Sequence, residues 1–199
     1  MTLQDKHAFI TGGGTGIGLA IAQDLAAKGA RVTITGRRQE VLDAVSGNGI
    51  TGMAMDVRDE AQVINTIARA VEANGPVQIC VANAGVAEGR SLHKTDLDFW
   101  RDMMATNLDG AFLTIRESLK SMRQTDWGRV IAVSSMAGLR GLPGAACYSA
   151  SKHGMIGLIR SLSEDYMGQP FTFNALCPGY VDTEIIARNT QAISNRAGL

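Results

Sequence analysis

The feature that most constrains this chain of 199 residues is a regular alternation of short apolar runs with longer segments of helical periodicity. Six runs are predicted as strands: His7–Ile10, Val32–Thr35, Gly52–Met55, Val77–Ala82, Arg129–Val133 and Phe171–Leu176. Five segments between and after them are predicted as helices: Ile17–Lys28, Gln39–Val45, Glu60–Ala73, Asp98–Arg123 and Ser149–Tyr166. Strands that alternate with helices form βαβ units. We therefore expect an α/β fold with a doubly wound parallel sheet, of Rossmann type and strand order 3-2-1-4-5-6.

The composition excludes several classes of protein. Lys+Arg and Asp+Glu both number 19, so charge gives no reason to expect nucleic acid or an anionic membrane surface as a partner. Cys80, Cys147 and Cys177 are odd in number and share no C-x-x-C spacing, so we expect free thiols in a reducing compartment. No signal-peptide run and no apolar stretch of membrane-spanning length occurs, which favours a cytoplasmic protein. His7 and His93 form no ligand cluster, and no metal site is predicted.

A glycine-rich turn directly follows the first predicted strand and precedes the first predicted helix. Its sequence, Thr11–Gly18, has the spacing G-x-x-x-G-x-G, and no Gly-Lys-Ser/Thr follows it, so a nucleoside-triphosphate P-loop is not expected. Glycines allow the backbone to turn tightly and to approach a pyrophosphate, which the amino end of a helix attracts. A merely flexible turn is the alternative, but the strand–turn–helix position favours a dinucleotide site. Its candidate contacts are Gly12, Gly14, Thr15, Gly16, Ile17 and Gly18.

Two arginines end the second predicted strand, where a dinucleotide-binding fold holds the adenosine ribose. NAD-binding sites commonly place a carboxylate there, whereas this strand ends in Gly36, Arg37 and Arg38. A guanidinium matches the oxygens of a 2′-phosphate, so Arg37 and Arg38 favour NADP(H) as the cofactor, with NAD(H) possible. The alternative is that both are solvated residues at the start of a helix.

Tyr148 and Lys152 are four residues apart in a segment of helical periodicity, so their side chains share one face. An ammonium beside a phenol favours the phenolate, which would lower the Tyr148 pKa towards working pH and make it a usable general acid/base. Ser135 follows the fifth predicted strand, at the carboxyl edge where open α/β sheets bind ligands. Taken alone, a Y-x-x-x-K pair is weak evidence and is more typical of a surface pair on any helix.

Taken together, six motifs resemble in order and spacing those of the short-chain dehydrogenase/reductase family. They are Thr11–Gly18, Asn83-Ala84-Gly85, Asn107, Ser135, Tyr148 with Lys152, and Pro178-Gly179. The resemblance extends from about residue 5 to about residue 188. The stretch from Ser134 to Lys152 is similar to the 3-oxoacyl-thioester reductase branch, and sugar, polyol and hydroxysteroid enzymes share much of it.

The resemblance implies a role for each matching catalytic position. Ser135 would hydrogen-bond the substrate oxygen, and Tyr148 would donate a proton to that oxygen in reduction or remove one in oxidation. Lys152 would lower the Tyr148 pKa and bind the ribose of the nicotinamide. Asn107 would hold a water that links Lys152 to solvent. The alternative for Asn107, which lies within a predicted helix, is a purely structural kink residue.

The resemblance also implies cofactor contacts outside the glycine-rich turn. Asp56 and Val57 would contact the adenine, although Asp56 is also a suitable cap for the next helix. Asn83 and its neighbours would close the cofactor floor, and the segment that begins at Pro178 would contact the nicotinamide carboxamide. The positions concerned are Asp56, Val57, Asn83, Ala84, Gly85, Tyr148, Lys152, Pro178, Gly179, Val181 and Thr183.

The predicted function is hydride transfer between NADP(H) and a ketone or secondary alcohol, with a 3-oxoacyl thioester or a similar small carbonyl compound as the expected substrate. An NAD-linked secondary alcohol dehydrogenase and a non-catalytic dinucleotide sensor of the same fold are the alternatives. We expect a single dinucleotide-binding and catalytic domain over residues 1–199, paired into a homodimer or homotetramer through its long helices. The family's usual seventh strand and final helix have no counterpart before Leu199, so we also expect a chain truncated at its C-terminus.

Overall fold

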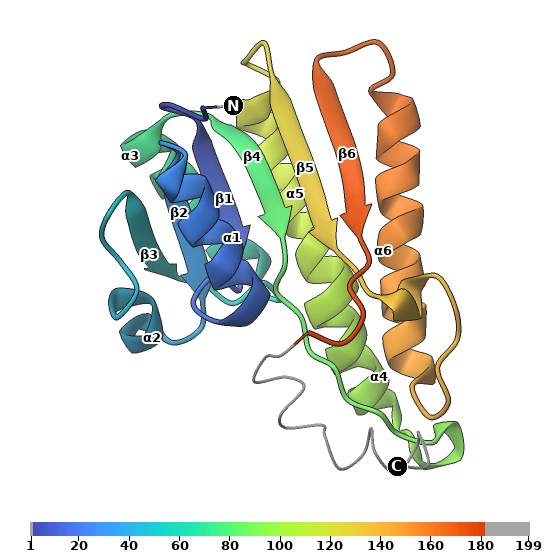
Figure 1. The fold of residues 1–199 in the computed structure, drawn as a ribbon. Helices are drawn as coiled ribbons and strands as arrows, with labels where there is room; N and C mark the ends of the chain where they lie inside the picture. Colours follow the sequence, from blue (N-terminus) through green and yellow to red (C-terminus); the bar gives the residue numbers. More distant parts are fainter. Residues whose placement is uncertain (1, 182–199) are drawn as a thin grey trace.

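Six parallel strands form one sheet in the part of the chain that the structure describes. The structure, a computed structural model, describes residues 2–181. The strands are β1 (His7–Thr11), β2 (Arg31–Gly36), β3 (Ile50–Ala54), β4 (Val77–Ala82), β5 (Gly128–Val133) and β6 (Phe171–Leu176). They are ordered β3-β2-β1-β4-β5-β6, and every neighbouring pair is parallel (Figure 1). The predicted doubly wound sheet and its strand order are therefore confirmed.

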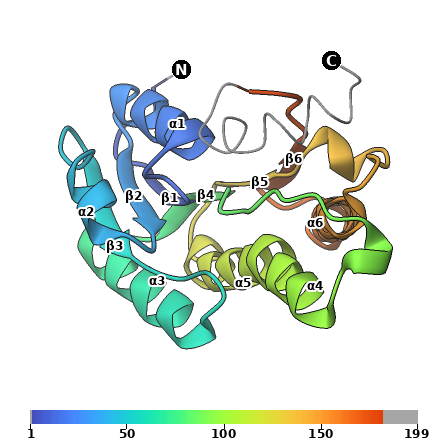
Figure 2. The ribbon, with the colours of Figure 1, turned by 90° about the horizontal axis from the view of Figure 1, so that it is seen from below.

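Helices lie on both faces of this sheet, as Figure 2 shows. Helix α1 lies on one face, and α3, α5 and α6 lie on the other. The helices are α1 (Gly16–Ala27), α2 (Gln39–Asp43), α3 (Glu60–Asn74), α4 (Leu97–Met104), α5 (Gly110–Met122) and α6 (Ala146–Asp165). Two short 3₁₀ turns, η1 (Leu92–Lys94) and η3 (Met136–Gly138), follow β4 and β5 respectively.

The apolar core has two parts, one on each side of the sheet. Phe9 and Val130 pack with residues of α3, α5 and α6, whereas Ile10 and Ile34 pack with residues of α1 and α2. Successive side chains of a strand point to opposite faces, so a strand covered on both faces must be apolar throughout. All five residues of β1 are buried, which explains why the central strands appear in the sequence as unbroken apolar runs.

One predicted helix is divided in the structure. The sequence pattern predicts a continuous helix over 98–123, but α4 ends at Met104 and α5 begins at Gly110, with a π-helical turn, η2 (Ala105–Asp109), between them. A π turn adds a residue to the helix and changes the direction of the side chains that follow. Asn107, in the middle of this turn, is fully buried. Other elements begin a few residues before their predicted positions: β3 begins at Ile50, and α6 begins at Ala146.

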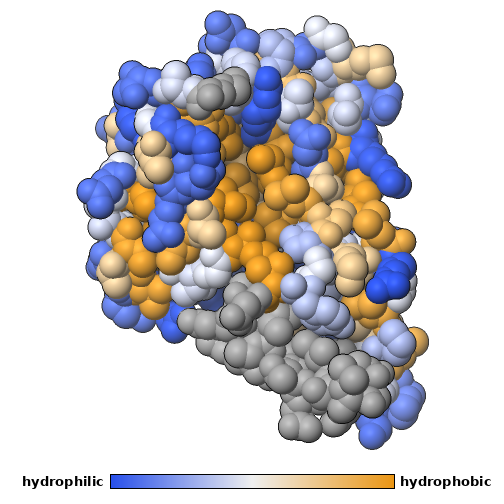
Figure 3. All heavy atoms as spheres, in the orientation of Figure 1, coloured by the Kyte–Doolittle hydropathy of each residue, from blue (hydrophilic) through white to orange (hydrophobic). Residues whose placement is uncertain are grey.

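Strand β6 lies at the edge of the described sheet, where it pairs with β5 (Figure 1). Its last residue, Leu176, is 47% exposed. In the orientation of Figure 1, apolar side chains gather beside α1 over the region of β4 and β5 (Figure 3). The described helices therefore cover this face of the sheet less completely than the face under α3, α5 and α6.

A buried histidine connects the amino ends of β1 and β2 with the carboxyl end of α3. His7 Nδ1 lies 2.7 Å from the carbonyl oxygen of Gly75, and Nε2 lies 3.0 Å from Thr33 Oγ1. Since a carbonyl only accepts, Nδ1 carries the proton and Nε2 accepts from the threonine hydroxyl. Thr33 Oγ1 in turn accepts from Asn74 Nδ2 at 3.2 Å. The network thus requires neutral His7, and burial accordingly lowers the His7 pKa from its ordinary 6.5.

This network predicts a loss of stability in mild acid. Just below about pH 6.5, His7 binds a proton in the unfolded chain but stays neutral in the folded chain. The free energy of unfolding therefore falls as the pH drops towards the folded pKa. We expect about 1 kcal/mol of stability to be lost between about pH 7.5 and 5.5 through this residue. The measurement is urea denaturation across that range for the unaltered protein and His7→Gln, with exposed His93→Gln as the control. The pH dependence should be weaker in His7→Gln alone; an unchanged pH dependence would contradict the assignment.

Candidate active site

The predicted site residues follow the carboxyl ends of the strands, which parallel pairing brings to one edge of the sheet. The glycine-rich turn follows β1, Arg37 follows β2, Asn83 follows β4, Ser135 comes soon after β5, and the Pro178 segment follows β6. Helix α6 begins after the loop that leaves β5, and it carries Tyr148 and Lys152. Segments that are far apart in the sequence are therefore brought to a single edge by the topology alone (Figure 1).

The glycine-rich turn folds tightly between β1 and α1. Gly12 and Gly16 have φ of 64° and 54°, in the left-handed region that side chains disfavour. A Cβ on Gly18 would be 2.3 Å from the carbonyl oxygen of Gly12, so no larger residue fits there without movement of the backbone. Thr15 has extended backbone at the position before α1, and its side chain makes no cap hydrogen bond. The amino end of α1 thus presents its own N–H groups and its positive dipole end.

Asn83 holds this turn from the neighbouring strand. Its Nδ2 donates to the carbonyl oxygens of Thr11 at 2.9 Å and Gly12 at 3.1 Å. In the other direction, Thr11 Oγ1 accepts from the backbone N–H groups of Asn83 and Ala84, both at 3.0 Å. The Asn83 motif is therefore joined to the glycine-rich turn by four hydrogen bonds, and Gly85 continues from it towards Lys152 and Asn107.

The arginines after β2 and the acid after β3 lie near one another. Arg37 and Arg38 are both exposed, and within residues 2–181 neither side chain makes a hydrogen bond or ion pair. Asp56 is bound instead by Arg58, whose Nη2 lies 2.7 Å from Asp56 Oδ2. That contact is the main cause of a lowered Asp56 pKa, to which the charge of Arg37 also contributes. Asp59, not Asp56, caps α3 by accepting from the Gln62 N–H.

Lys152 is buried at the junction of β5 and α6, with 4% of the residue exposed. Its Nζ donates to the carbonyl oxygen of Val133 at 2.9 Å, and Ser134 Oγ donates to the carbonyl oxygen of Lys152 at 3.1 Å. Two adjacent residues of the sheet edge therefore hold both the side chain and the backbone of the lysine. Burial lowers the Lys152 pKa to about 8, and the nearby Cys177 opposes that shift.

Tyr148 lies one helical turn before Lys152, with its ring centroid 5.9 Å from Lys152 Nζ. The expected lowering of the Tyr148 pKa by Lys152 is wrong for this structure. Burial raises the Tyr148 pKa above 10, and the group that opposes the rise is Ser135, through a side-chain hydrogen bond. The physical reason is that the ammonium is bound to the Val133 carbonyl and is itself made less basic by burial. Ser135 also accepts from the Ala137 N–H at 3.1 Å, so its position is fixed.

Asn107 reaches the same region from the π-helical turn. Its Oδ1 accepts from the Val86 N–H at 2.8 Å, and its Nδ2 donates to the Val86 carbonyl oxygen and to Ser151 Oγ, both at 3.0 Å. A Cβ on Gly85 would be 3.2 Å from Asn107 Oδ1 and 3.5 Å from Lys152 Nζ, so Gly85 separates the two polar groups. The side-chain amide of Asn107 is thus directed to Val86 and Ser151, and it makes no direct hydrogen bond to Lys152 in the described structure.

The segment after β6 lies beside the segment after β5. Ser134 N–H donates to the Leu176 carbonyl oxygen at 2.7 Å, and Met136 N–H donates to that of Pro178 at 3.0 Å. Gly179 therefore lies near Met136, with the position of an added Cβ 3.7 Å from its sulfur. Val181 is exposed, and Thr183 lies outside the described residues.

Three residues that hold this site were not singled out in the sequence. They are Val133, Ser134 and Ser151, which contact Lys152 or Asn107 directly. Ser134 and Ser151 stand next to Ser135 and Lys152 in the chain, but no spacing marks them, because their partners come from distant segments. Val133 acts through its carbonyl oxygen, which no sequence pattern identifies.

The arrangement fits a dinucleotide. The turn leaves no room for side chains at Gly12 or Gly18, and the first turn of α1 carries N–H groups suited to a pyrophosphate. Arg37 is exposed beside Asp56 and is free to bind a ribose phosphate or hydroxyl. At the far end of this edge, Ser135, Tyr148 and Lys152 supply a hydrogen-bond donor, a phenol and an ammonium. These are groups that can orient a carbonyl oxygen and exchange a proton with it.

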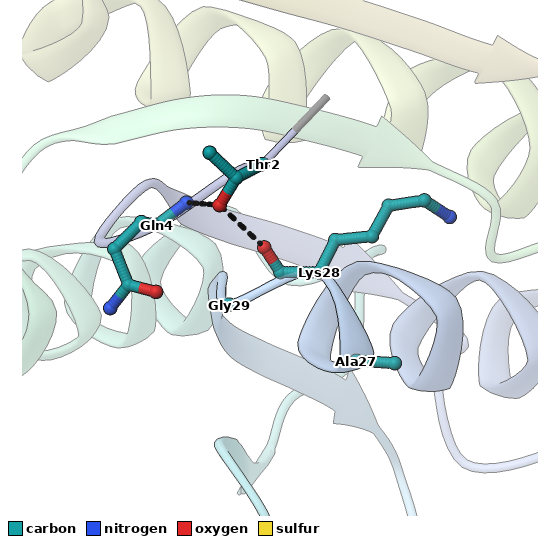
Figure 4. A pocket seen from close by; sticks show the side chains of 5 residues that line it. All are labelled: Thr2, Gln4, Ala27, Lys28 and Gly29. Carbon is teal, nitrogen blue, oxygen red and sulfur yellow. Dashed lines mark hydrogen bonds between the residues drawn. The ribbon is translucent and has the colours of Figure 1, made fainter.

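Other parts of residues 2–181 offer little competing chemistry. A surface hollow lined by Thr2, Gln4, Ala27, Lys28 and Gly29 lies at the amino ends of β1 and β2 (Figure 4). In it Thr2 accepts from the Gln4 N–H at 3.3 Å and donates to the Lys28 carbonyl oxygen at 3.5 Å. No group of three His, Cys, Asp or Glu residues suited to a metal ion occurs within the described range. None of the described helices is long and apolar enough to span a membrane.

Known proteins resemble the chain over nearly its whole length. Residues 6–194 match the family described as short chain dehydrogenase. The 3-oxoacyl-[acyl-carrier-protein] reductase MabA of Mycobacterium avium is 35% identical over 191 residues, which cover 96% of this chain and 71% of that protein. A variant of actinorhodin polyketide ketoreductase, solved with NADPH, superposes with a TM-score of 0.93 at 35% identity, covering 98% of this chain and 78% of that one.

A second solved structure carries the other nicotinamide cofactor. It is a short-chain dehydrogenase/reductase from Burkholderia phymatum in complex with NAD, with a TM-score of 0.89 and 29% identity, covering 96% of this chain and 71% of that one. The family match spans more than nine-tenths of the chain, and the fold and the ordered motifs agree with it. The chain therefore belongs to the short-chain dehydrogenase/reductase family of oxidoreductases.

Proposed function

We propose that this protein is an NADP(H)-dependent carbonyl reductase that interconverts a ketone and a secondary alcohol. The observation that carries the proposal is the meeting of Ser135, Tyr148 and buried Lys152 at the sheet edge that also holds the glycine-rich turn. A non-catalytic sensor needs the turn but has no use for a buried ammonium beside a phenol. The direct test is NADPH oxidation by the purified protein with a panel of ketones, followed at 340 nm.

Ser135, Tyr148 and Lys152 have distinct roles in the proposed reduction. When bound, the cofactor supplies the hydride that adds to the carbonyl carbon. Ser135 donates a hydrogen bond to the carbonyl oxygen and fixes its direction, and the Tyr148 hydroxyl gives that oxygen a proton as the new C–H bond forms. The hydrogen bond from Ser135 also favours the phenolate that remains, and Lys152 would bind the ribose hydroxyls of the cofactor at the same edge. Alcohol oxidation is the reverse, with Tyr148 as the base.

Asn107 has an indirect place in this scheme. We propose that it keeps the π-helical turn and Val86 in position, so that a water between Asn107 and Lys152 can pass protons to solvent. The kink and the catalytic interpretations of Asn107 are then complementary, because its buried amide is what ties the turn to the loop after β4.

The glycine-rich turn, Asp56 with Val57, the Asn83–Gly85 segment and the segment from Pro178 to Thr183 are proposed to hold the dinucleotide. NADP(H) is preferred in this proposal because Arg37 and Arg38 follow β2, where no carboxylate stands to accept from a ribose 2′-hydroxyl. A 3-oxoacyl thioester is the proposed substrate class, because the similar MabA protein is named as a 3-oxoacyl-[acyl-carrier-protein] reductase. We also propose that the protein forms a homo-oligomer. A reducing, cytoplasmic compartment is proposed in keeping with the three free cysteines.

Replacing Tyr148 by Phe should abolish most of the chemistry. The substitution keeps the ring and removes the proton donor, so kcat for ketone reduction should fall by about 10²–10⁴-fold. The Kd for NADPH, measured by fluorescence, should change little. Tyr166→Phe is the matched control, since Tyr166 packs on Phe171 and Phe173 at the other end of α6. Retention of more than about a tenth of the rate in Tyr148→Phe would refute the assignment.

Replacing Arg37 by Ala should alter the choice of cofactor. A charge-assisted contact with a 2′-phosphate is worth roughly 1.5–3 kcal/mol, so the preference for NADPH over NADH should fall by about one to two orders of magnitude. The measurement is kcat/KM for both cofactors at a fixed concentration of ketone. Arg69→Ala, which removes an exposed arginine of α3, should leave the ratio unchanged. An unaltered protein that shows no preference for NADPH would support the NAD-linked alternative instead.

Replacing Lys152 by Met should stabilise the fold and inactivate the protein. The folded pKa of about 8 lies below the ordinary 10.5, so stability is greatest above pH 10.5 and is lost as the pH falls through 8. At pH 7 the buried charge carries its full cost, and removing it should raise the free energy of unfolding by about 1–3 kcal/mol. Urea denaturation and NADPH oxidation at pH 7 test both effects, with exposed Lys94→Met as the control. A less stable Lys152→Met protein would contradict the reasoning.

A further inference from the structure

Ser151 is a fully buried hydroxyl between the two catalytic candidates of α6. Its Oγ donates to the carbonyl oxygen of Tyr148 at 2.8 Å and accepts from Asn107 Nδ2 at 3.0 Å. The only proton of the hydroxyl is used in the first bond, so the second bond needs the asparagine as donor. Ser151 therefore joins the π-helical turn to the first turn of α6.

The amide of Asn107 depends on this serine for its last partner. One Nδ2 proton is used by the Val86 carbonyl oxygen, and Oδ1 accepts from the Val86 N–H. The other Nδ2 proton is directed to Ser151 Oγ, with only the Met103 sulfur, at 3.2 Å, as a further and weaker acceptor. Because Asn107 is fully buried, water cannot easily replace a lost acceptor.

A continuous series of hydrogen bonds thus runs from the loop after β4 to the backbone of Tyr148. It passes from the Val86 backbone through Asn107 to Ser151, and the two side chains that form it, those of Asn107 and Ser151, are fully buried. Val86 follows Gly85, where an added Cβ would be 3.5 Å from Lys152 Nζ, so the series begins close to the lysine ammonium. Without Ser151 the asparagine amide would keep only its two bonds to Val86, and Val86 would lose its hydrogen-bonded connection to α6 through Asn107.

We propose that Ser151 is a positioning residue of the active site, which acts through Asn107. Its hydroxyl adds to the two Val86 bonds a third hydrogen bond that holds the Asn107 amide against α6, and the amide in turn holds Val86 and the loop beside Lys152. Ser151 touches neither substrate nor cofactor, so its removal lowers turnover without weakening cofactor binding to the same degree. Since the role concerns the proposed carbonyl reduction, it rests on the proposed function.

A double-mutant cycle on the whole protein tests this role. The variants are Ser151→Ala, Asn107→Ala and the double substitution, with kcat and KM for NADPH-dependent ketone reduction and Kd for NADPH as readouts. Ser151→Ala is expected to lower kcat about tenfold and to change Kd for NADPH by less than about twofold. In the Asn107→Ala background the same substitution should lower kcat by less than about twofold, because the partner through which it acts is gone.

Two further variants keep the test decisive. Ser149→Ala is the matched control: Ser149 is a buried serine of the same helix whose hydroxyl has no hydrogen-bond partner, so its removal should leave kcat unchanged. Ser151→Cys, which retains a weaker donor and acceptor of similar size, should recover part of the rate lost in Ser151→Ala. The cysteine variant decides the matter if the double variant does not fold.

Three results for kcat would contradict the positioning role of Ser151. Full kcat in Ser151→Ala, an equal loss of kcat in both backgrounds, or a cysteine variant no better than the alanine variant would each overturn the positioning role. An unaltered protein that binds NADPH but reduces no ketone would refute the proposed function itself. In that case coupling between Ser151 and Asn107 in the free energy of unfolding would mark the contact as structural only, and the role in turnover would be withdrawn.

Discussion

Burial of the Lys152 ammonium is the constraint on which the rest of the site depends. A charged group out of water requires a fixed acceptor, and here the acceptor is the Val133 carbonyl oxygen at the carboxyl end of β5. Ser134 donates a hydrogen bond to the Lys152 carbonyl oxygen, so both the side chain and the backbone of Lys152 connect α6 to the end of β5. Gly138 shows how closely they approach, because a Cβ there would be 2.5 Å from Ser134 Oγ and 2.8 Å from the Lys152 carbonyl oxygen. The helix that carries Tyr148 is thereby fixed against the strand that leads to Ser135.

Similar polar ties connect the other elements of the same edge. Asn83 holds the glycine-rich turn to β4, and Asn107 holds the π-helical turn to Val86. Each tie uses a buried or half-buried amide with several partners, and amides left without partners would cost stability. The core on the two faces of the sheet sets the positions of the strands, and these polar bonds set the relative positions of the loops. The chemistry of the site depends on the second set of contacts at least as much as on the first.

The fold could be predicted from the sequence because its signals are local. Apolar runs, helical periodicity and the turn at Thr11–Gly18 fix the βαβ units, and the strand order follows from the way such units connect. The same local signals placed Tyr148 and Lys152 on one helical face and Ser135 at a strand end. A kink at Asn107 was only an alternative from the sequence, and its π-helical form was not predicted, since it depends on the burial of Asn107 against Val86, which is distant in sequence. The direction of the Tyr148 pKa was missed for the same reason, because burial and the partner of Lys152 are properties of the assembled fold.

We propose that this sheet edge carries out carbonyl reduction by direct hydride transfer, with the proton supplied separately by the protein. The most direct test uses NADPH that carries two deuterium atoms at C4 of the nicotinamide, a 3-oxoacyl thioester as substrate, and mass spectrometry of the hydroxyacyl product. Direct transfer should leave one deuterium in each product molecule, bound to the carbinol carbon and not exchangeable with water. Formation of the alcohol without deuterium, or deuterium lost to solvent, would contradict it.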